Sequence, residues 1–321
     1  MIEPVVVSHY PVVPTVPWDG NPRLLPGIEL RDYQISSIHK GLLKKRGVFR
    51  IPTAGGKSEI FISLSKILKK KTLVLTNSSN LLTQTALRFR KRGFKSVGVV
   101  GHLRPKDRKY LDEANIEVWN PLEPEEVFRK KVVVGMIQSL SGLIKQGQEE
   151  VLPFLRSIGV LHVDECHSLA AASQRMVVSR VPALYRFGYS GTPFHDSFQP
   201  EKNPRDLILL GLTGGMIVSL SHSYLIERKF IAPPHVYFQR ISTPRIPHFR
   251  WKGVHASGIV RNEERNRIIS QGALRLWHRG HKTLIIVGHK KQGAILMELI
   301  EKLGVKTYFS HGGKQVQEWN L

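Results

Sequence analysis

The sequence predicts an α/β protein built around a doubly wound parallel sheet, and three observations lead to this prediction. Between residues 28 and 220, short apolar runs of strand length alternate with segments of helical periodicity. Turn residues separate the two kinds of segment, a rhythm typical of repeated βα units. A glycine-rich turn follows the first run and an Asp-Glu pair follows the fifth, where open parallel sheets place their ligands. The six expected strands are 48–51, 72–76, 97–101, 132–135, 160–163 and 187–190.

Residues 1–27 form a proline-rich arm ahead of this first domain, which spans 28–220. The arm contains six prolines, and this density disfavours both helix and interior strand. We therefore expect an extended segment that lies on the first domain.

A phosphate-binding loop is expected directly after the first strand. Glycines that lack a Cβ let backbone N–H groups approach a phosphate at the start of the next helix. Lys57 would reach the β and γ phosphates of ATP, and the Ser58 hydroxyl would bind Mg²⁺. Ile51 stands where the full motif has its first glycine, so a helix start with a chance Lys-Ser pair explains this segment equally well when it is taken alone. The expected nucleotide-binding residues here are Thr53, Ala54, Gly55, Gly56, Lys57 and Ser58.

An acidic pair follows the apolar run 158–163. At the carboxyl end of a buried strand, Asp164 can hold Mg²⁺ and Glu165 can act as general base on the attacking water. Alone, such a pair is more often a solvated helix cap. Its position beside a phosphate loop favours the catalytic interpretation.

The segment 163–167 reads VDECH and resembles the DExH signature of superfamily-two helicases. Further segments resemble the motifs of that family in the same order. The resemblance implies that Gln34, helped by Arg31, recognises adenine, and that Ser190 and Thr192 in an SGTP turn couple nucleotide state to domain movement. It implies a catalytic set of Lys57, Asp164, Glu165 and His167 and DNA-backbone contacts from Asn77, Ser78, Gln138 and Ser139.

Two later tracts are similar to XPB-type and phage UvsW-type DNA helicases, namely 205–234 and 259–266. This likeness implies that the first domain has a RecA-like core. It also implies a bridge and linker over 221–258 and a second RecA-like domain over 259–321, with strands at 283–287 and 305–309. Because a complete domain needs more βα units, we expect an incomplete one. The family's arginine-finger motif would be missing, and the chain would bind nucleotide and DNA better than it hydrolyses ATP.

The charge balance indicates a polyanionic partner. The chain has 48 Lys and Arg against 25 Asp and Glu, a formal net charge of +23, which favours phosphate-rich partners by counterion release. A cluster at 66–71 fits a solvated helix end. The cluster that trails the second strand is instead expected to contact the DNA backbone through Arg88, Arg90 and Arg92.

Composition excludes several classes. We find no apolar stretch of membrane-spanning length and no signal peptide, so we expect a cytoplasmic protein without a membrane partner, in the host cytoplasm if it is phage-encoded. The single cysteine, Cys166, excludes a disulfide framework, and its place in the DExH box suggests packing instead of nucleophilic chemistry. None of the 14 histidines has zinc-site spacing.

The function that these observations favour is an ATP- and Mg²⁺-dependent DNA helicase that remodels forked or branched DNA. Its setting would be phage recombination, replication or repair. Two alternatives remain open at this stage: a duplex translocase that does not separate strands, and a nucleotide-gated DNA-binding module without efficient ATPase activity.

Overall fold

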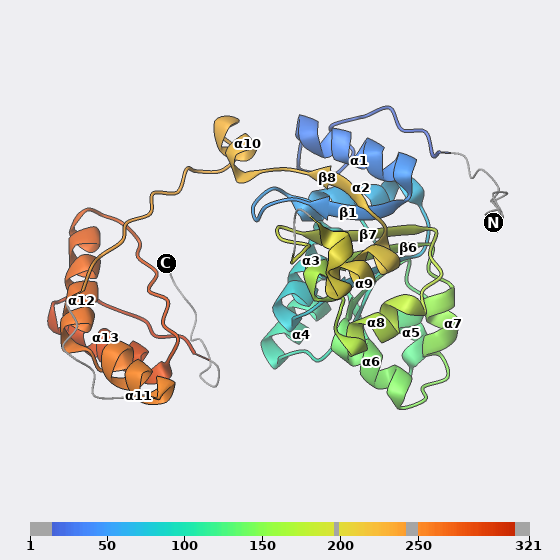
Figure 1. Cartoon of the computed structure of the whole chain (residues 1–321). Coiled ribbons are helices and arrows are strands. Elements are labelled where there is room, and N and C mark those ends of the chain that lie inside the picture. Colours follow the sequence, from blue (N-terminus) through green and yellow to red (C-terminus); the bar gives the residue numbers. More distant parts are fainter. Residues whose placement is uncertain (1–14, 196–198, 242–249, 312–321) are drawn as a thin grey trace, which may run out of the picture. The chain divides into compact units, whose positions relative to one another are not determined.

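The computed structural model describes residues 15–195, 199–241 and 250–311 of the chain. The chain divides into two compact units, Met1–Pro233 and Pro234–Leu321. The first unit contains the sheet and the second contains helices and extended segments (Figure 1).

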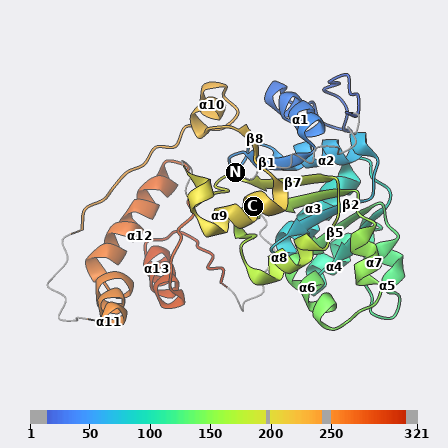
Figure 2. The ribbon, with the colours of Figure 1, turned by 45° about the vertical axis from the view of Figure 1, so that its right-hand side comes forward.

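The first unit is an eight-stranded sheet in the order β4-β3-β5-β2-β6-β7-β1-β8. Every neighbouring pair of strands is parallel. All carboxyl ends therefore meet at one edge, and Figure 2 shows β7, β1 and β8 next to one another. The strands are β1 (Arg46–Arg50), β2 (Thr72–Thr76), β3 (Val97–Val100), β4 (Glu117–Val118), β5 (Val132–Met136), β6 (Val160–Asp164), β7 (Tyr185–Ser190) and β8 (Met216–Ser219). The doubly wound parallel sheet expected from the sequence is confirmed.

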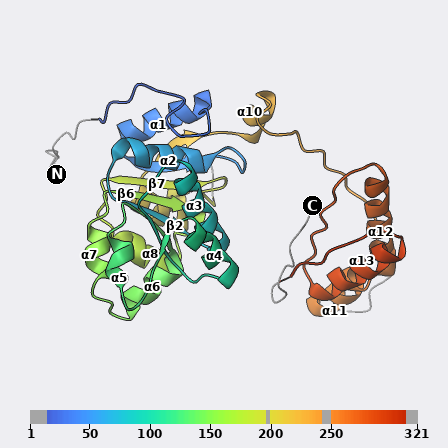
Figure 3. The ribbon, with the colours of Figure 1, turned by 180° about the vertical axis from the view of Figure 1, so that it is seen from behind.

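Helices cover both faces of the sheet. The first four pack with one core cluster and the next five with the other. The helix α9 lies in front of the sheet in Figure 1, and α3 and α4 lie in front of it in the opposite view of Figure 3. The helices of this unit are α1 (Asp32–Lys44), α2 (Lys57–Leu68), α3 (Ser79–Lys91), α4 (Pro105–Glu113), α5 (Pro124–Phe128), α6 (Ile137–Lys145), α7 (Val151–Arg156), α8 (Ala172–Ser179), α9 (Pro204–Thr213) and α10 (His222–Glu227), with short 3₁₀ turns η1 (Cys166–Ser168) and η2 (Pro200–Lys202).

The apolar runs of the sequence become strands because both of their faces are covered. All residues of β2, β3 and β7 are buried, as expected for parallel strands between two helical layers. The strands β4 and β8 were not expected. The first has only two residues, and the second lies at the sheet edge, where it pairs with β1.

The ends of the first unit pack onto its core. Of the arm expected over 1–27, the first 14 residues lie outside the described residues, while Leu25 is buried and Trp18 packs against the core cluster. After β8, the side chain of Leu225 is fully buried and Phe230 packs on Tyr33 with 5.5 Å between ring centroids. The beginning of the expected bridge is thus part of the first unit.

The described part of the second unit contains α11 (Trp251–His255), a π-helical turn η3 (Ala256–Val260), α12 (Glu263–His278) and α13 (Lys290–Lys302). The segments 283–287 and 305–309 are extended, but within residues 250–311 neither is paired as a strand, so the two expected strands are not formed. Ile285 and Val287 pack on the small hydrophobic core of the second unit, which lies between α12 and α13. Leu284 and Ile286 are 84% and 86% exposed. The alternation of a strand is present. A strand also needs a hydrogen-bonding neighbour, which apolar periodicity does not supply.

Candidate ATPase site

The loop 51–56 turns from β1 into α2 and leaves no room for a side chain at positions 55 and 56. Gly56 is the residue before the helix and has φ +74°, in the left-handed region. A Cβ on Gly56 would lie 2.3 Å from Nε2 of Gln34, and one on Gly55 would lie 2.6 Å from the Ile51 side chain. Thr53 and Ala54 are exposed at the tip of the turn. The loop is therefore a small-residue cradle at a helix N-terminus, with Lys57 and Ser58 in the first helical turn.

The start of α1 holds this cradle from behind. Tyr33 donates its hydroxyl proton to the carbonyl of Gly55 at 2.8 Å, and Arg31 Nη1 donates to the Tyr33 hydroxyl at 3.0 Å. Gln34 Oε1 accepts from the Arg31 N–H at 2.9 Å, and Gln34 Nε2 lies 3.4 Å from the Gly56 carbonyl. The side chain expected to read adenine is thus buried and bonded to backbone, and reading a base requires exchange of these bonds. Tyr33 was missed from the sequence, although it stands between Arg31 and Gln34.

An acidic pair ends β6, two strands away from the phosphate loop in the sheet order. Burial raises the pKa of Asp164; the charge of Glu165 adds to this rise and that of Lys57 opposes it. Glu165 follows in a left-handed conformation with φ +50°, which directs the chain into η1. The site therefore concentrates negative charge where a cation would relieve it.

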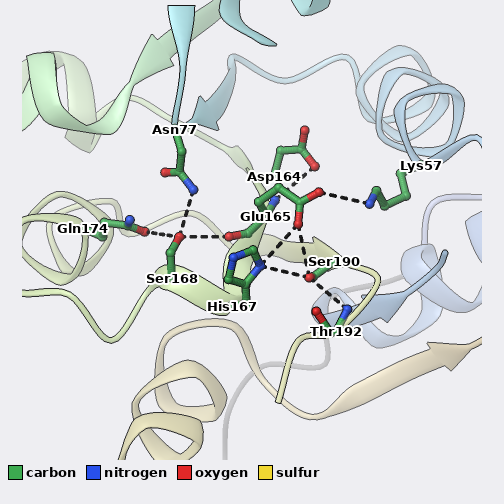
Figure 4. A network of polar contacts seen from close by, with 9 residues as sticks. All are labelled: Lys57, Asn77, Asp164, Glu165, His167, Ser168, Gln174, Ser190 and Thr192. Atoms are coloured by element: carbon green, nitrogen blue, oxygen red, sulfur yellow. Dashed lines mark hydrogen bonds and ion pairs between the residues drawn. The ribbon is translucent and has the colours of Figure 1, made fainter. Parts of the chain in front are cut away.

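The Glu165 carboxylate is the centre of a polar network (Figure 4). Its Oε1 lies 3.3 Å from Lys57 Nζ, which comes from the phosphate loop. Its Oε2 lies 3.3 Å from Ser190 Oγ at the end of β7 and 3.3 Å from His167 Nδ1. Ser190 Oγ is also 3.2 Å from His167 Nδ1 and accepts from the Thr192 N–H at 3.2 Å. The structure thus brings together Lys57, Glu165, His167 and Ser190, while Thr192 joins through its backbone and exposes its side chain.

A second polar chain reaches the same turn from β2. Asn77, the residue after β2, donates its Nδ2 to Ser168 Oγ at 2.9 Å. Ser168 Oγ lies 2.9 Å from the Glu165 carbonyl and 2.9 Å from Gln174 Oε1 (Figure 4). Ser168 and Gln174 were not predicted. Ser168 directly follows the DECH segment and could have been considered, whereas no sequence signal marks Gln174.

The arginines expected on the DNA backbone are placed differently. Arg92 is buried and forms a two-bond ion pair with Glu59, from Nε and Nη2 at 3.0 Å each, and donates to the Pro26 carbonyl at 2.9 Å. Arg90 donates to the backbone carbonyls of Phe94 and Lys95, after α3, and of Ala114, at the end of α4. In this structure the N–H groups of both side chains are directed into the protein, and their expected DNA contact stays a prediction. Arg88 stays half-exposed.

The remaining expected DNA contacts lie at helix starts. Ser78 caps α3 and accepts from the Leu81 N–H at 3.3 Å. Gln138 is exposed and Ser139 half-buried in the first turn of α6. These side chains follow β2 and β5, which are neighbours in the sheet. They therefore share the carboxyl edge of the sheet with the acidic pair.

These residues fit ATP and Mg²⁺. Side chains of Ile51 and Gln34 occupy the Cβ positions of Gly55 and Gly56, so a larger residue at either position would displace the loop at the helix N-terminus, where a phosphate binds. Ser58 and Asp164 are a hydroxyl and a carboxylate, the oxygen ligands that Mg²⁺ prefers. Among the described residues no group of three or more His, Cys, Asp or Glu side chains is arranged to hold a metal ion.

Comparison with protein families assigns the chain. Residues 27–195, which hold the phosphate loop, the acidic pair and the SGTP turn, match the model for the type III restriction enzyme res subunit. The chain belongs to this family. The likeness of this res-subunit family member to superfamily-two helicases of the XPB and UvsW kind is thereby confirmed.

Two curated relatives of this family member are DNA motors by name. The chain is 26% identical over 194 residues to the DNA 3'-5' translocase XPB2 of Sulfurisphaera tokodaii. This alignment covers 59% of this chain and 36% of the relative. It is 22% identical over 316 residues to the ATP-dependent DNA helicase uvsW of Enterobacteria phage T4, which covers 95% of this chain and 56% of the relative. The chain thus spans about a third of the length of the first relative and little more than half of the second.

Among solved structures, the crystal structure of the UvsW helicase from bacteriophage T4 is similar to this chain at 22% identity and a TM-score of 0.41. That match covers 59% of this chain and 60% of the other.

Within the described residues, no helix has the length and apolar character to cross a membrane.

Proposed function

We propose that this protein is an ATP-dependent DNA helicase that remodels forked or branched DNA, in phage recombination, replication or repair. The observation that carries the proposal is the convergence on Glu165 of Lys57 from the phosphate loop and of Ser190 and His167 from the neighbouring turns. A carboxylate so placed can orient and deprotonate a water beside a bound phosphate.

The proposed roles follow from these positions. Lys57 and the N–H groups of the cradle would hold the phosphates, and Ser58 and Asp164 would hold Mg²⁺. Bound ATP supplies the phosphoanhydride whose hydrolysis drives movement. Glu165 takes a proton from the attacking water through a carboxylate oxygen. Lys57 is 3.3 Å away and balances its charge before phosphate is present.

DNA is the proposed partner. The net charge of +23 and the names of the two curated relatives support a nucleic-acid partner. The proposed backbone contacts at the carboxyl edge of the sheet come from Ser78, Gln138 and Ser139. The half-exposed Arg88, in the last turn of α3, is a further proposed contact. The proposed place of action is the cytoplasm, that of the host for a phage protein.

The Glu165→Gln variant of the full-length protein tests the proposal. The amide keeps the shape of the side chain and removes its basicity, so DNA-stimulated ATP hydrolysis should fall by about 10² to 10⁴. DNA affinity in the presence of ATP should be kept. The matched control is Glu125→Gln, on the exposed surface of α5, which should leave hydrolysis unchanged. Turnover by Glu165→Gln at the unmodified rate would overturn the assignment.

A duplex translocase is the second candidate, because the XPB2 relative carries that name. The two activities can be separated with two substrates. A helicase displaces a strand from a fork, while a translocase displaces the third strand from a triplex on plain duplex DNA. Triplex displacement without fork unwinding would select the second candidate.

A further inference from the structure

We propose that Asn77 and Gln174 are positioning residues that act on Glu165 through Ser168. The proposal rests on the function proposed above, in which Glu165 is the general base. Figure 4 shows that Asn77, Gln174 and the Glu165 carbonyl all meet at the Ser168 hydroxyl. Each link is a hydrogen-bond distance of 2.9 Å.

Glu165 needs such support because of its backbone. Its φ of +50° lies in the left-handed region, which residues with a Cβ rarely adopt. The carboxylate is held on one side by Lys57 and Ser190. On the backbone side, Ser168 Oγ lies 2.9 Å from the Glu165 carbonyl oxygen and the Ser168 N–H lies 3.3 Å from the same oxygen. Ser168 thus fixes the turn from which the carboxylate extends.

Ser168 has two possible acceptors for one proton. Its hydroxyl can donate to the Glu165 carbonyl or to Gln174 Oε1, both at 2.9 Å, while it accepts from Asn77 Nδ2. A displacement of Asn77 or Gln174 therefore changes how firmly the Glu165 turn is held. This makes Ser168 the point at which two other elements act on the base.

Asn77 lies at the carboxyl edge of the sheet, where the DNA backbone is proposed to bind. It lies between β2 and the capping residue Ser78, in the loop expected to contact the DNA backbone. Its Nδ2 is directed to Ser168, and its Oδ1 is buried without a hydrogen-bond partner among the described residues. The buried, unpaired Oδ1 is unfavourable for stability. The hydrogen bond from Nδ2 to Ser168 is therefore the contact that explains an amide at this position. We infer that the loop after β2 and the general base move together.

The test uses Asn77→Ala, Ser168→Ala and the double variant in the full-length protein. Loss of positioning should lower kcat of the DNA-stimulated ATPase by about tenfold or more, within the roughly 100-fold that a misplaced catalytic group can lose. KM for ATP should change by less than about twofold in all three variants, since no ATP-binding group is removed. The DNA dissociation constant of Ser168→Ala should likewise change by less than about twofold. Ser168→Thr keeps the hydroxyl and should restore most of kcat.

The double variant distinguishes one network from two independent effects. If Asn77 acts through Ser168, Asn77→Ala adds nothing once Ser168 is alanine, whereas additive losses would overturn the proposal. A rise in the DNA dissociation constant for Asn77→Ala with kcat unchanged at saturating DNA would also overturn it. That result would make Asn77 a DNA contact only.

A structural readout separates this proposal from the proposed function. Amide hydrogen exchange over residues 165–169 should be faster in Asn77→Ala and Ser168→Ala than in the unmodified protein, whether or not the protein hydrolyses ATP. The control Asn120→Ala removes an asparagine that accepts from the Leu122 N–H in its own loop, and it should leave 165–169 unchanged. Unchanged exchange in Asn77→Ala would refute the positioning role. Absence of DNA-stimulated ATPase in the unmodified protein would refute the proposed function alone.

Discussion

The buried histidine of β6 should make the first unit sensitive to acid. His162 is fully buried, with Ser65 Oγ 3.1 Å from its Nε2 and the Tyr189 hydroxyl 3.0 Å from its Nδ1. Burial lowers the pKa of His162 from 6.5 to about 3. The imidazole therefore joins the phosphate-loop helix α2 to β6 and β7 in its neutral form.

The sign of the effect follows from this lowered pKa. Between pH 6.5 and about 3 the unfolded chain binds a proton at His162 that the folded chain does not bind. The stability contribution is complete above pH 6.5 and is lost as the pH falls through this window. A pH of 5 is about 1.5 units below the ordinary histidine pKa of 6.5, and each pH unit changes the free energy of unfolding by about 1.4 kcal/mol while the two states differ by one proton. From pH 7.5 to pH 5 this group should therefore lower the free energy of unfolding by about 2 kcal/mol.

The assay is urea unfolding of the first unit at pH 7.5 and pH 5.0, for the unmodified protein and for His162→Gln. The amide cannot titrate in this range, and all other ionisable groups are common to both proteins. The unmodified protein should therefore lose about 2 kcal/mol more than the variant between the two pH values. Equal losses would refute the reasoning, as would an NMR titration of the His162 ring with a midpoint above pH 5.

Two further predictions use matched pairs. Gly56→Ala should weaken ATP binding at least about tenfold in a fluorescence titration, because the new Cβ would lie 2.3 Å from Gln34. The control Gly147→Ala also places alanine at a positive φ, but with open space around it, and should leave ATP binding unchanged. Arg92→Ala leaves Glu59, whose side chain is 13% exposed, without its closest cation and should lower the free energy of unfolding by about 3 kcal/mol. Arg129→Ala breaks an exposed pair with Glu125 and should cost at most about 1 kcal/mol in urea unfolding. Equal effects within either pair would contradict these readings.

Strands with two covered faces could be predicted from the sequence, and strands that depend on a partner could not. The runs of β2, β5 and β6 are mostly apolar, so the apolar pattern of the sequence identified them. The edge strand β8 is largely exposed apart from Val218, and its assignment comes from pairing with β1. The extended segment at 283–287 has the periodicity of a strand and lacks a partner among residues 250–311.

The site shows the same division between local pattern and tertiary contact. The phosphate cradle and the acidic pair are each contained in a few consecutive residues, and the structure brings Lys57 and Glu165 to 3.3 Å. The ion pair of Arg92 with Glu59 was missed because Glu59 lies 33 residues earlier and nothing in the spacing indicates the pair. The bond between Asn77 and Ser168 spans 91 residues and was missed for the same reason.

The burial of Cys166 has a practical consequence. This thiol is closed off from solvent against Gly188, and burial raises its pKa, so it is protonated at neutral pH and out of reach of reagents. It is the single cysteine of the chain. A cysteine introduced on the exposed surface of each unit would therefore carry a dye at a known place, without mutation inside the DExH segment. Energy transfer between two such dyes would follow the separation of the two units as nucleotide and DNA are added.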